Sequence, residues 1–413
     1  MPERKVHIAE NQNYGCIQCG RCCRRFHVLM SEDEALRLGR LLASRPNDLP
    51  KEFVTRIDGK PYFARRPSGA CVFLDEDTGY CRMHSLFGFE QKALSCRGYP
   101  VNIASSFPGE VSAIARQDCP AVQQNAGRPL TRQRREIEGL VEELDPQRPF
   151  TRRVLEGLDR KAVEAMVGLL VEIMRDETPV PPRQRAGTFR DVVVRLEKIK
   201  DFANDPVALS EMLPNLLAKA RAASGQRAEA GLSGFSRAVF RTWLGACLRR
   251  DTELVRPGVV QRVLRMWTML QLTFGHGSLH RLGWEHPRTT LDQCPIFGAQ
   301  AEPSDDAAWA SYRRWLLSRL EAYQFFGVTF YDEPFFPGLR ALALTYPLVL
   351  AAARHHSRSR GANRIEEPDV HYGIGAIDHT LGRSPLMQYP PWRIVENHFF
   401  TRWDKLLATL GWE

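Results

Sequence analysis

The sequence predicts an α+β protein, in which a small cysteine-cluster module over residues 1–125 precedes a mainly α-helical domain over residues 126–413. Three observations support this division. Eight of the ten cysteines lie between Cys16 and Cys119. The first 125 residues contain short apolar runs separated by turn residues, whereas the remainder shows the apolar spacing of helices. All eight tryptophans follow residue 240, which predicts an aromatic core in the helical domain.

Local signals place the elements of the module. Ser31 and Glu34 form a capping box before an apolar run, which predicts a helix over residues 32–44. Asp58-Gly59 is a strong signal for a two-residue hairpin turn. The expected hairpins pair residues 53–57 with 61–64, 71–74 with 80–81, and 101–104 with 111–115. Short strands joined by turns suit a module that metal ligation stabilises in place of a large core.

From about residue 131 the pattern changes to helices. Helices are expected over residues 131–144, 151–175, 188–203, 207–223, 234–249, 257–274, 304–326, 338–357 and 368–381. A stiff proline-rich stretch near 178–188 and a loose stretch near 225–234 are the candidate points of subdivision. Gly373-Ile-Gly375 is the nearest fragment to a glycine-rich nucleotide turn. No strand precedes it, so we interpret it as helix packing or a loop.

Composition and charge exclude several classes of protein. With 413 residues, of which 43% are hydrophobic and 25% charged, the chain has globular composition and enough length for two or three domains. The net charge of +9 is spread along the chain, which disfavours a dedicated nucleic-acid binder. The longest apolar run, Ala341 to Ala353, contains Pro347 and is too short to span a membrane. Since the N-terminus has no apolar segment, we expect a cytoplasmic protein that binds no membrane.

The spacing of the first cysteines predicts a metal centre. Thiols in the cytosol stay reduced, so a dense cluster there favours metal ligation over disulfide bonds. The first group is Cys16-x2-Cys19-x2-Cys22-Cys23, and its two-residue spacings let backbone turns direct successive thiolates to one centre. The run is similar to the start of the bacterial ferredoxin motif. The adjacent Cys22 and Cys23 point in different directions, so one ligates this centre while the other binds a second metal or remains a free thiol.

Four later cysteines complete the set, but they lack the second C-x2-C knuckle that a pair of zinc ribbons needs. The nearest substitute is Cys81-x2-His84, which makes His84 an optional ligand. Soft thiolates suit both zinc and iron–sulfur clusters, and the triple spacing favours a [4Fe–4S] cluster over zinc. Whether there are one or two centres stays open. The predicted metal ligands are Cys16, Cys19, Cys22, Cys23, Cys71, Cys81, Cys96 and Cys119.

Several arginines lie within two residues of these cysteines. They are Arg21, Arg24, Arg25, Arg82 and Arg97. Four thiolates around a divalent zinc ion leave a formal negative charge, which neighbouring guanidinium groups would offset. The alternative is that these arginines form an ordinary solvated face.

These residues resemble a known family. The motifs are similar to those of the CxxCxxCC family of zinc- or iron-chelating cysteine-cluster proteins. They are Cys16-x2-Cys19-x2-Cys22-Cys23, Ala70-Cys-Val-Phe-Leu-Asp75, Tyr80-Cys-Arg-Met-His84 and Leu94-Ser-Cys-Arg-Gly-Tyr-Pro100. Within the family, the Cys-x2-His step, the Ser-Cys-x2-Tyr-Pro step and Asp118-Cys119-Pro120 are most similar to flagellin lysine-N-methylases. The resemblance covers about residues 14–125.

The resemblance implies a bound zinc or iron–sulfur centre. For the methylase branch it also implies methyl transfer from S-adenosylmethionine (SAM) to lysines of a protein such as flagellin. The helical domain has no motif that matches residue by residue, so the catalytic and cofactor-binding residues stay unknown. The aromatic segments around Tyr331 and Tyr389 are candidates for oxygens near the lysine amine. The alternative function is a non-enzymatic metal carrier or an assembly protein with a structural metal centre.

Overall fold

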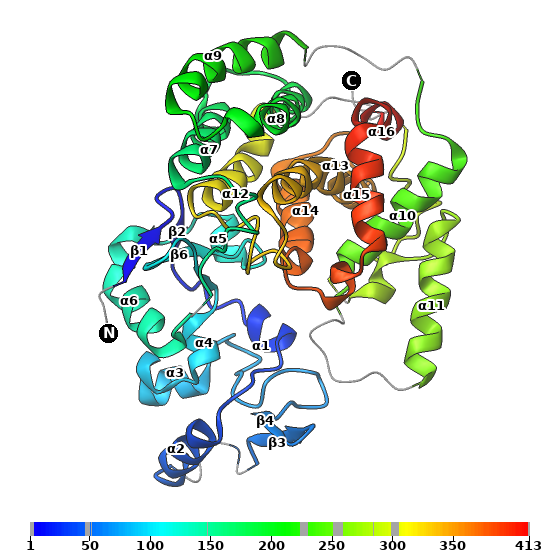
Figure 1. Cartoon of the computed structure of the whole chain (residues 1–413). Helices are drawn as coiled ribbons and strands as arrows, with labels where there is room; N and C mark the ends of the chain where they lie inside the picture. Colours follow the sequence, from blue (N-terminus) through cyan, green and yellow to red (C-terminus); the bar gives the residue numbers. More distant parts are fainter. Residues whose placement is uncertain are drawn as a thin grey trace.

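The predicted α+β fold class is confirmed by the computed structural model (Figure 1). The structure describes residues 4–45, 50, 52–146, 148–223, 230–250, 259–283, 285–298 and 305–411. A small N-terminal region carries the strands and the cysteine cluster, and the rest of the described chain is mostly helical.

The strands of the described chain form three small sheets in the N-terminal third. They are β1 (Lys5–Ile8), β2 (Asn13–Tyr14), β3 (Val54–Ile57), β4 (Lys60–Phe63), β5 (Val101–Ser105), β6 (Glu110–Ala115) and β7 (Arg128–Pro129). The β3–β4 and β5–β6 hairpins confirm two of the predicted pairings. The third is reduced to one bridge between Leu74 and Cys81. The sequence pattern missed that β1 pairs with β6 in parallel and β2 with β7.

Short helices connect these strands. They are α1 (Arg21–Arg25), α2 (Glu32–Ala43), α3 (Arg82–Phe87), α4 (Leu94–Gly98), α5 (Pro120–Gln123) and α6 (Arg134–Leu144). The capping box of α2 is present, because Ser31 Oγ accepts from the Glu34 N–H at 3.1 Å and the Glu34 carboxylate accepts from the Ser31 N–H at 2.9 Å. Cys81 and Cys119 stand at the N-caps of α3 and α5. These two helices are too short to produce a periodic apolar pattern.

The remaining helices follow in chain order. They are α7 (Arg160–Arg175), α8 (Pro182–Lys198), α9 (Pro206–Ala223), α10 (Gly234–Leu248), α11 (Val259–Thr273), α12 (Ala310–Glu321), α13 (Phe335–Ser359), α14 (Glu367–Thr380), α15 (Pro391–Thr401) and α16 (Trp403–Leu410). Helix α8 starts six residues before its predicted start at 188, because proline is tolerated at a helix N-terminus. The first half of the loose stretch 225–234, residues 225–229, lies outside the described residues. The division of the chain into domains stays a prediction.

Helix α13 is the centre of the helical part. It runs through Pro347 and is long and apolar enough to cross a membrane by length and composition, but 89% of its most apolar window is buried in the protein. Its extent was underestimated by the run of apolar residues alone. A Cβ on Gly373 of α14 would lie 2.8 Å from the Val349 carbonyl oxygen, so this glycine lets α14 pack closely on α13. The predicted aromatic core is present, with Trp243, Trp309, Trp315 and Trp403 fully buried.

The N-terminal sheet packs directly against the helical part. The Gln324 side chain, just after α12, donates to the Ser112 carbonyl at 3.3 Å and to the Asn102 carbonyl at 3.1 Å. On the other side of the sheet, Ile137 and Val141 of α6 join its apolar core. The cysteine-bearing loops lie between this sheet and the outer β3–β4 hairpin, as the blue and cyan ribbons show (Figure 1).

Candidate metal centre

The loop that carries Cys16 and Cys19 has an unusual backbone. Gln18 and Gly20 both adopt left-handed conformations, with φ of 57° and 63°. The loop lies against the turn that precedes Cys81, where a Cβ on Gly79 would be 2.2 Å from the Gln18 carbonyl oxygen. Glycine at position 79 therefore allows the loop with Cys16 and Cys19 to lie close to the segment that carries Cys81.

Five cysteines from four segments gather around one small apolar core. They are Cys22, Cys23, Cys71, Cys81 and Cys96, and we call them the five-cysteine group. The Cys71 N–H donates to the Cys23 carbonyl at 2.9 Å, and the Cys22 and Cys23 sulfurs are 4.0 Å apart. The surrounding core includes Met30, Leu38, Phe63, Phe73 and Met83. Segments that are far apart in sequence thus bring their thiols to one place.

The pKa values of these thiols depend on one another. The pKa of Cys71 is raised to about 11, mainly by burial and also by the charges of Cys81 and Cys22, against the lowering effect of the Phe73 N–H. Burial also raises the pKa of Cys96, together with the charges of Cys71, Cys81 and Cys22. The hydrogen bond with Cys23 lowers the pKa of Cys22 to about 7. Ionising several of these thiols together is costly unless a cation offsets their charge.

The other three predicted ligands lie outside the apolar core around this group. Cys119 is buried in the core of the sheet beside Tyr14, and Cys16 and Cys19 are exposed. Burial raises the pKa of Cys119 to about 12, although the N–H groups of Val122 and Ala121 lower it. The charge of Cys22 acts on both Tyr14 and Cys119, so Cys22 stands between the two sets.

The donor chemistry fits a soft metal. All ten cysteines are free thiols. Across the part of the chain that the structure describes, no three His, Cys, Asp or Glu side chains are close enough to hold one metal ion. A tetrahedral zinc ion with Zn–S bonds of about 2.3 Å needs thiolates roughly 3.8 Å apart. An iron–sulfur cluster accepts more widely spaced thiolates, because each one binds a different iron atom.

Three other predicted residues have different surroundings. His84 is exposed and its ring lies 5.9 Å from that of Phe89. Partial desolvation and the charge of Lys92 lower its pKa. This position favours packing over ligation. The Tyr331 hydroxyl donates to the Thr380 carbonyl at 2.9 Å, and Tyr389 is exposed.

The cations that act on the thiols are not those expected. Among the five predicted arginines, Arg21, Arg25 and Arg97 form ion pairs with carboxylates. The charge of Lys92 lowers the pKa of both Cys22 and Cys96, and the charge of Arg65 lowers that of Cys71. Sequence analysis missed both residues, because the fold sets their distance from the sulfurs and no spacing motif marks them.

A buried set of charges joins the cysteine region to the helical part. We call Arg25, Arg116, Asp118, Glu285 and His379 the boundary ion cluster. The Asp118 carboxylate accepts from Arg116 Nη2 at 2.5 Å and from His379 Nδ1 at 3.3 Å, and it pairs with Arg25 Nη1 at 3.3 Å. Burial opposes the charge of Asp118, but the charge of Arg116 and the hydrogen bond from His379 hold its pKa well below the usual range.

Arg25 links the two sides of this boundary. It pairs with Asp118, the residue before Cys119, and also with Glu285 in the segment after α11. Glu285 further pairs with Arg21 at 3.1 Å and lies 3.6 Å from Arg250. The cysteine segments are therefore held against the helical part by charges that lie one or two residues from Cys22, Cys23 and Cys119.

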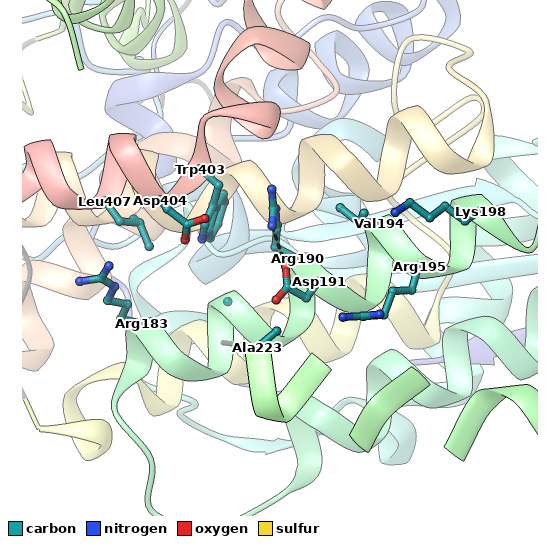
Figure 2. Close-up of a pocket in the computed structure, with 11 residues that line it drawn as sticks. Arg183, Arg190, Asp191, Val194, Arg195, Lys198, Ala223, Trp403, Asp404 and Leu407 are labelled. Carbon is teal, nitrogen blue, oxygen red and sulfur yellow. Dashed lines mark hydrogen bonds and ion pairs between the residues drawn. The ribbon is translucent and has the colours of Figure 1, made fainter. Parts of the chain in front are cut away.

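A separate basic pocket lies in the helical part. It has a volume of about 280 Å³, just below the range of roughly 300–1,000 Å³ that is usual for small-molecule sites. Figure 2 shows Arg195 and Lys198 at one end and Arg183 near Leu407 at the other. The pocket is lined by none of the predicted site residues.

Comparison with known proteins identifies one domain. Residues 15–123 match the family model CxxCxxCC, "Putative zinc- or iron-chelating domain", and this stretch contains all eight predicted ligands. Neither the curated proteins nor the solved structures contain a significant match to the chain. No comparison shows a similarity to flagellin methylases. Over residues 15–123, therefore, the chain matches a zinc- or iron-chelating domain of the CxxCxxCC type.

Proposed function

We propose that the five-cysteine group holds an iron–sulfur cluster through Cys71, Cys81, Cys96 and one of the adjacent pair Cys22 and Cys23. The observation that carries this proposal is the convergence of these thiols from four segments around one core. In such a cluster each of these thiolates would bind a different iron atom. The fifth cysteine then remains a thiol beside the cluster.

The surrounding charges support an anionic centre. Lys92 and Arg65 act on the thiols and would offset part of the negative charge of a thiolate-bound cluster. A backbone N–H from Phe73 also lowers the pKa of Cys71 and would stabilise its thiolate. These groups all belong to the chain itself.

In this proposal the cluster has a structural role. The core around the five-cysteine group is small, so the free energy of metal binding supplies much of the free energy of folding for this region. The ordered region in turn presents Arg25 and Asp118 to the helical part. Loss of the metal is therefore expected to disturb the boundary ion cluster as well as the cysteines.

Metal analysis of the anaerobically purified chain tests the proposal. Iron, acid-labile sulfide and a broad visible absorption are expected, and Cys71→Ser should remove most of all three. Cys294→Ser is the matched control, because Cys294 is also buried but lies in the helical part. Zinc without acid-labile sulfide would show that the centre is a zinc site and not a cluster. Folded protein without any metal would refute metal binding.

A second candidate function is methyl transfer from SAM to a protein lysine. Its support is the motif resemblance, together with the position of the half-buried Tyr99 and the buried Asp118 from those motifs beside His379. The Tyr99 hydroxyl donates to Asp118 Oδ1 at 3.2 Å, so the motif residues meet the helical part at one buried polar site. Incubation with labelled SAM and flagellin tests this function, and absence of both SAM binding and label transfer would refute it.

A metal carrier is the alternative without an enzyme activity. A carrier releases its metal readily, whereas a structural centre retains it. Rapid loss of all iron to a chelator, with the fold unchanged, would therefore favour carriage over the structural role.

A further inference from the structure

Helix α11 exposes a continuous apolar face. Leu264 is 57% exposed, Trp267 55% and Phe274, just after the helix, 67%. The full set of exposed apolar residues is Val259, Val260, Val263, Leu264, Met266, Trp267, Leu270 and Phe274. We call it the α11 stripe.

The helical period places the stripe on one side of α11. At about 100° per residue, its members fill an arc of roughly 160°. The buried residues Thr268 and Leu272 lie on the opposite side, where α10 packs. A Cβ on Gly245 of α10 would lie 3.2 Å from Leu272 Cδ1, so this contact is already close. Within the described residues, no element covers the stripe as α10 covers the opposite side of the helix.

The stripe is large for an exposed apolar patch. Its eight side chains, most of them more than half exposed, amount to several hundred Å² of apolar surface, which matches the largest patch on a typical monomer, about 300–600 Å² and often functional. A standard interface buries roughly 800 Å² on each partner, with an apolar centre and a polar rim. The stripe is therefore large enough to form the centre of such an interface.

We propose that the stripe is a dimerisation surface, on which α11 of a second copy of this chain packs antiparallel. A two-fold axis beside Trp267 brings Val260 against Phe274 of the second copy and Leu264 against its Leu270. The spacing of residues 260, 264, 267, 270 and 274 approximates the alternating three- and four-residue steps of helix pairs. A small residue then meets a large one at the ends of the contact.

The distribution of charge supports a second copy over a lipid surface. The stripe contains no charged residue, so two-fold packing brings no like charges together at its centre. Helices that lie on anionic membranes carry lysine and arginine along their apolar edges. Arg262 and Arg265 of α11 lie along one edge of the stripe only, where they line a hollow with Met266 and Leu270. Helix α11 stands at the edge of the molecule, where a second copy has access (Figure 1).

The mass of the intact chain in solution tests this proposal. We expect the full-length protein to sediment as a dimer at micromolar concentration and Leu264→Glu to halve its mass. Leu36→Glu is the matched control, because Leu36 of α2 is 60% exposed but lies outside the stripe. Both variants should keep the wild-type circular dichroism spectrum and melting temperature.

Three outcomes would overturn the proposal. The first is a monomeric wild-type protein at every concentration that stays soluble. The second is a dimer that Leu264→Glu leaves intact. The third is wild-type binding to phosphatidylglycerol vesicles that Leu264→Glu abolishes while the protein remains monomeric, which would assign the stripe to a membrane surface. A photo-reactive amino acid at position 267 locates the contact: it should crosslink to α11 of the second copy, and crosslinks elsewhere would refute this geometry.

Discussion

Arg25 forms a buried ion pair with Glu285, and this pair connects the segment that carries Cys22 and Cys23 to the helical part of the chain. Both side chains are almost fully buried. Arg25 also pairs with Asp118 on its other side, so one guanidinium contacts carboxylates from two distant segments. The position of the cysteine segment against the helical part therefore depends on charges that are out of contact with water.

Glu285→Gln is expected to lower the free energy of unfolding by about 3 kcal/mol, because Arg25, Arg21 and Arg250 lose a buried counter-charge. Urea denaturation followed by circular dichroism measures the change. Glu32→Gln, which breaks an exposed pair with Arg56, is the control and should leave the midpoint unchanged. Equal midpoints for both variants would contradict the importance of the boundary ion cluster.

The exposed and the gathered cysteines should differ in their effect on metal content. Cys96→Ser is expected to remove most of the bound metal, since Cys96 belongs to the five-cysteine group. Cys19→Ser should have a smaller effect, because Cys19 is exposed and lies outside that group. Metal content per chain after anaerobic purification decides the point. Complete loss in Cys19→Ser would show that the first knuckle is part of the same centre.

Gly79→Ala should be more damaging than Gly69→Ala. Both glycines have positive φ, 74° and 82°, so both variants strain the backbone. Only at Gly79 would the new Cβ meet the Gln18 carbonyl oxygen, at 2.2 Å, whereas Gly69 has no neighbour within 4 Å. We expect Gly79→Ala to lose metal and melt at a lower temperature than Gly69→Ala. Identical behaviour would mean that the contact between the two loops does not support the metal centre.

Acid should destabilise the helical part through His286. Burial, followed by the charge of Arg250, lowers the pKa of His286 to about 3. Because the folded pKa lies below the unfolded value of about 6.5, the contribution of His286 is complete above pH 6.5 and is lost as the pH falls toward 3. At pH 4.5 the loss amounts to about 2–3 kcal/mol.

A glutamine at this position isolates the effect. His286 Nε2 donates to the Leu248 carbonyl at 2.8 Å, and Nδ1 accepts from the Tyr372 hydroxyl at 2.7 Å. The amide of His286→Gln can make both hydrogen bonds but does not titrate. The difference in unfolding free energy between pH 7 and pH 4.5 should therefore be smaller in the variant. An unchanged difference would assign the acid sensitivity to other groups.

Local signals predicted local structure well. Ser31 and Glu34 cap a helix as expected, and Asp58-Gly59 closes a hairpin, because both signals act over fewer than five residues. The parallel pairing of β1 with β6 has no such signal, since it joins strands about 100 residues apart in sequence. Helices α3 and α5, which have Cys81 and Cys119 at their N-caps, are single turns or little more, and periodicity does not detect them.

The predicted ligand set stays a prediction, but the fold adds neighbours that spacing did not indicate. Spacing alone grouped Cys22 with Cys16 and Cys19, and the fold also brings Cys22 and Cys23 to Cys71, Cys81 and Cys96. Tertiary packing decides which thiols share a neighbourhood. The partners Lys92 and Glu285 were missed for the same reason.

The pairing of β1 with β6 has a consequence for the order in which the chain becomes ordered. Val6 pairs with Val111, so this one contact encloses every member of the five-cysteine group within a single loop of chain. Closing a long loop of chain costs conformational entropy. Once the loop is closed, a further contact inside it costs less entropy, because its ends are already closer together. Pairing of β1 with β6 therefore reduces the entropy that is lost when the thiols bind a metal, and metal binding reduces the entropy that is lost when the strands pair. During synthesis this closure becomes possible only after β6 has left the ribosome, when all five thiols are already outside it.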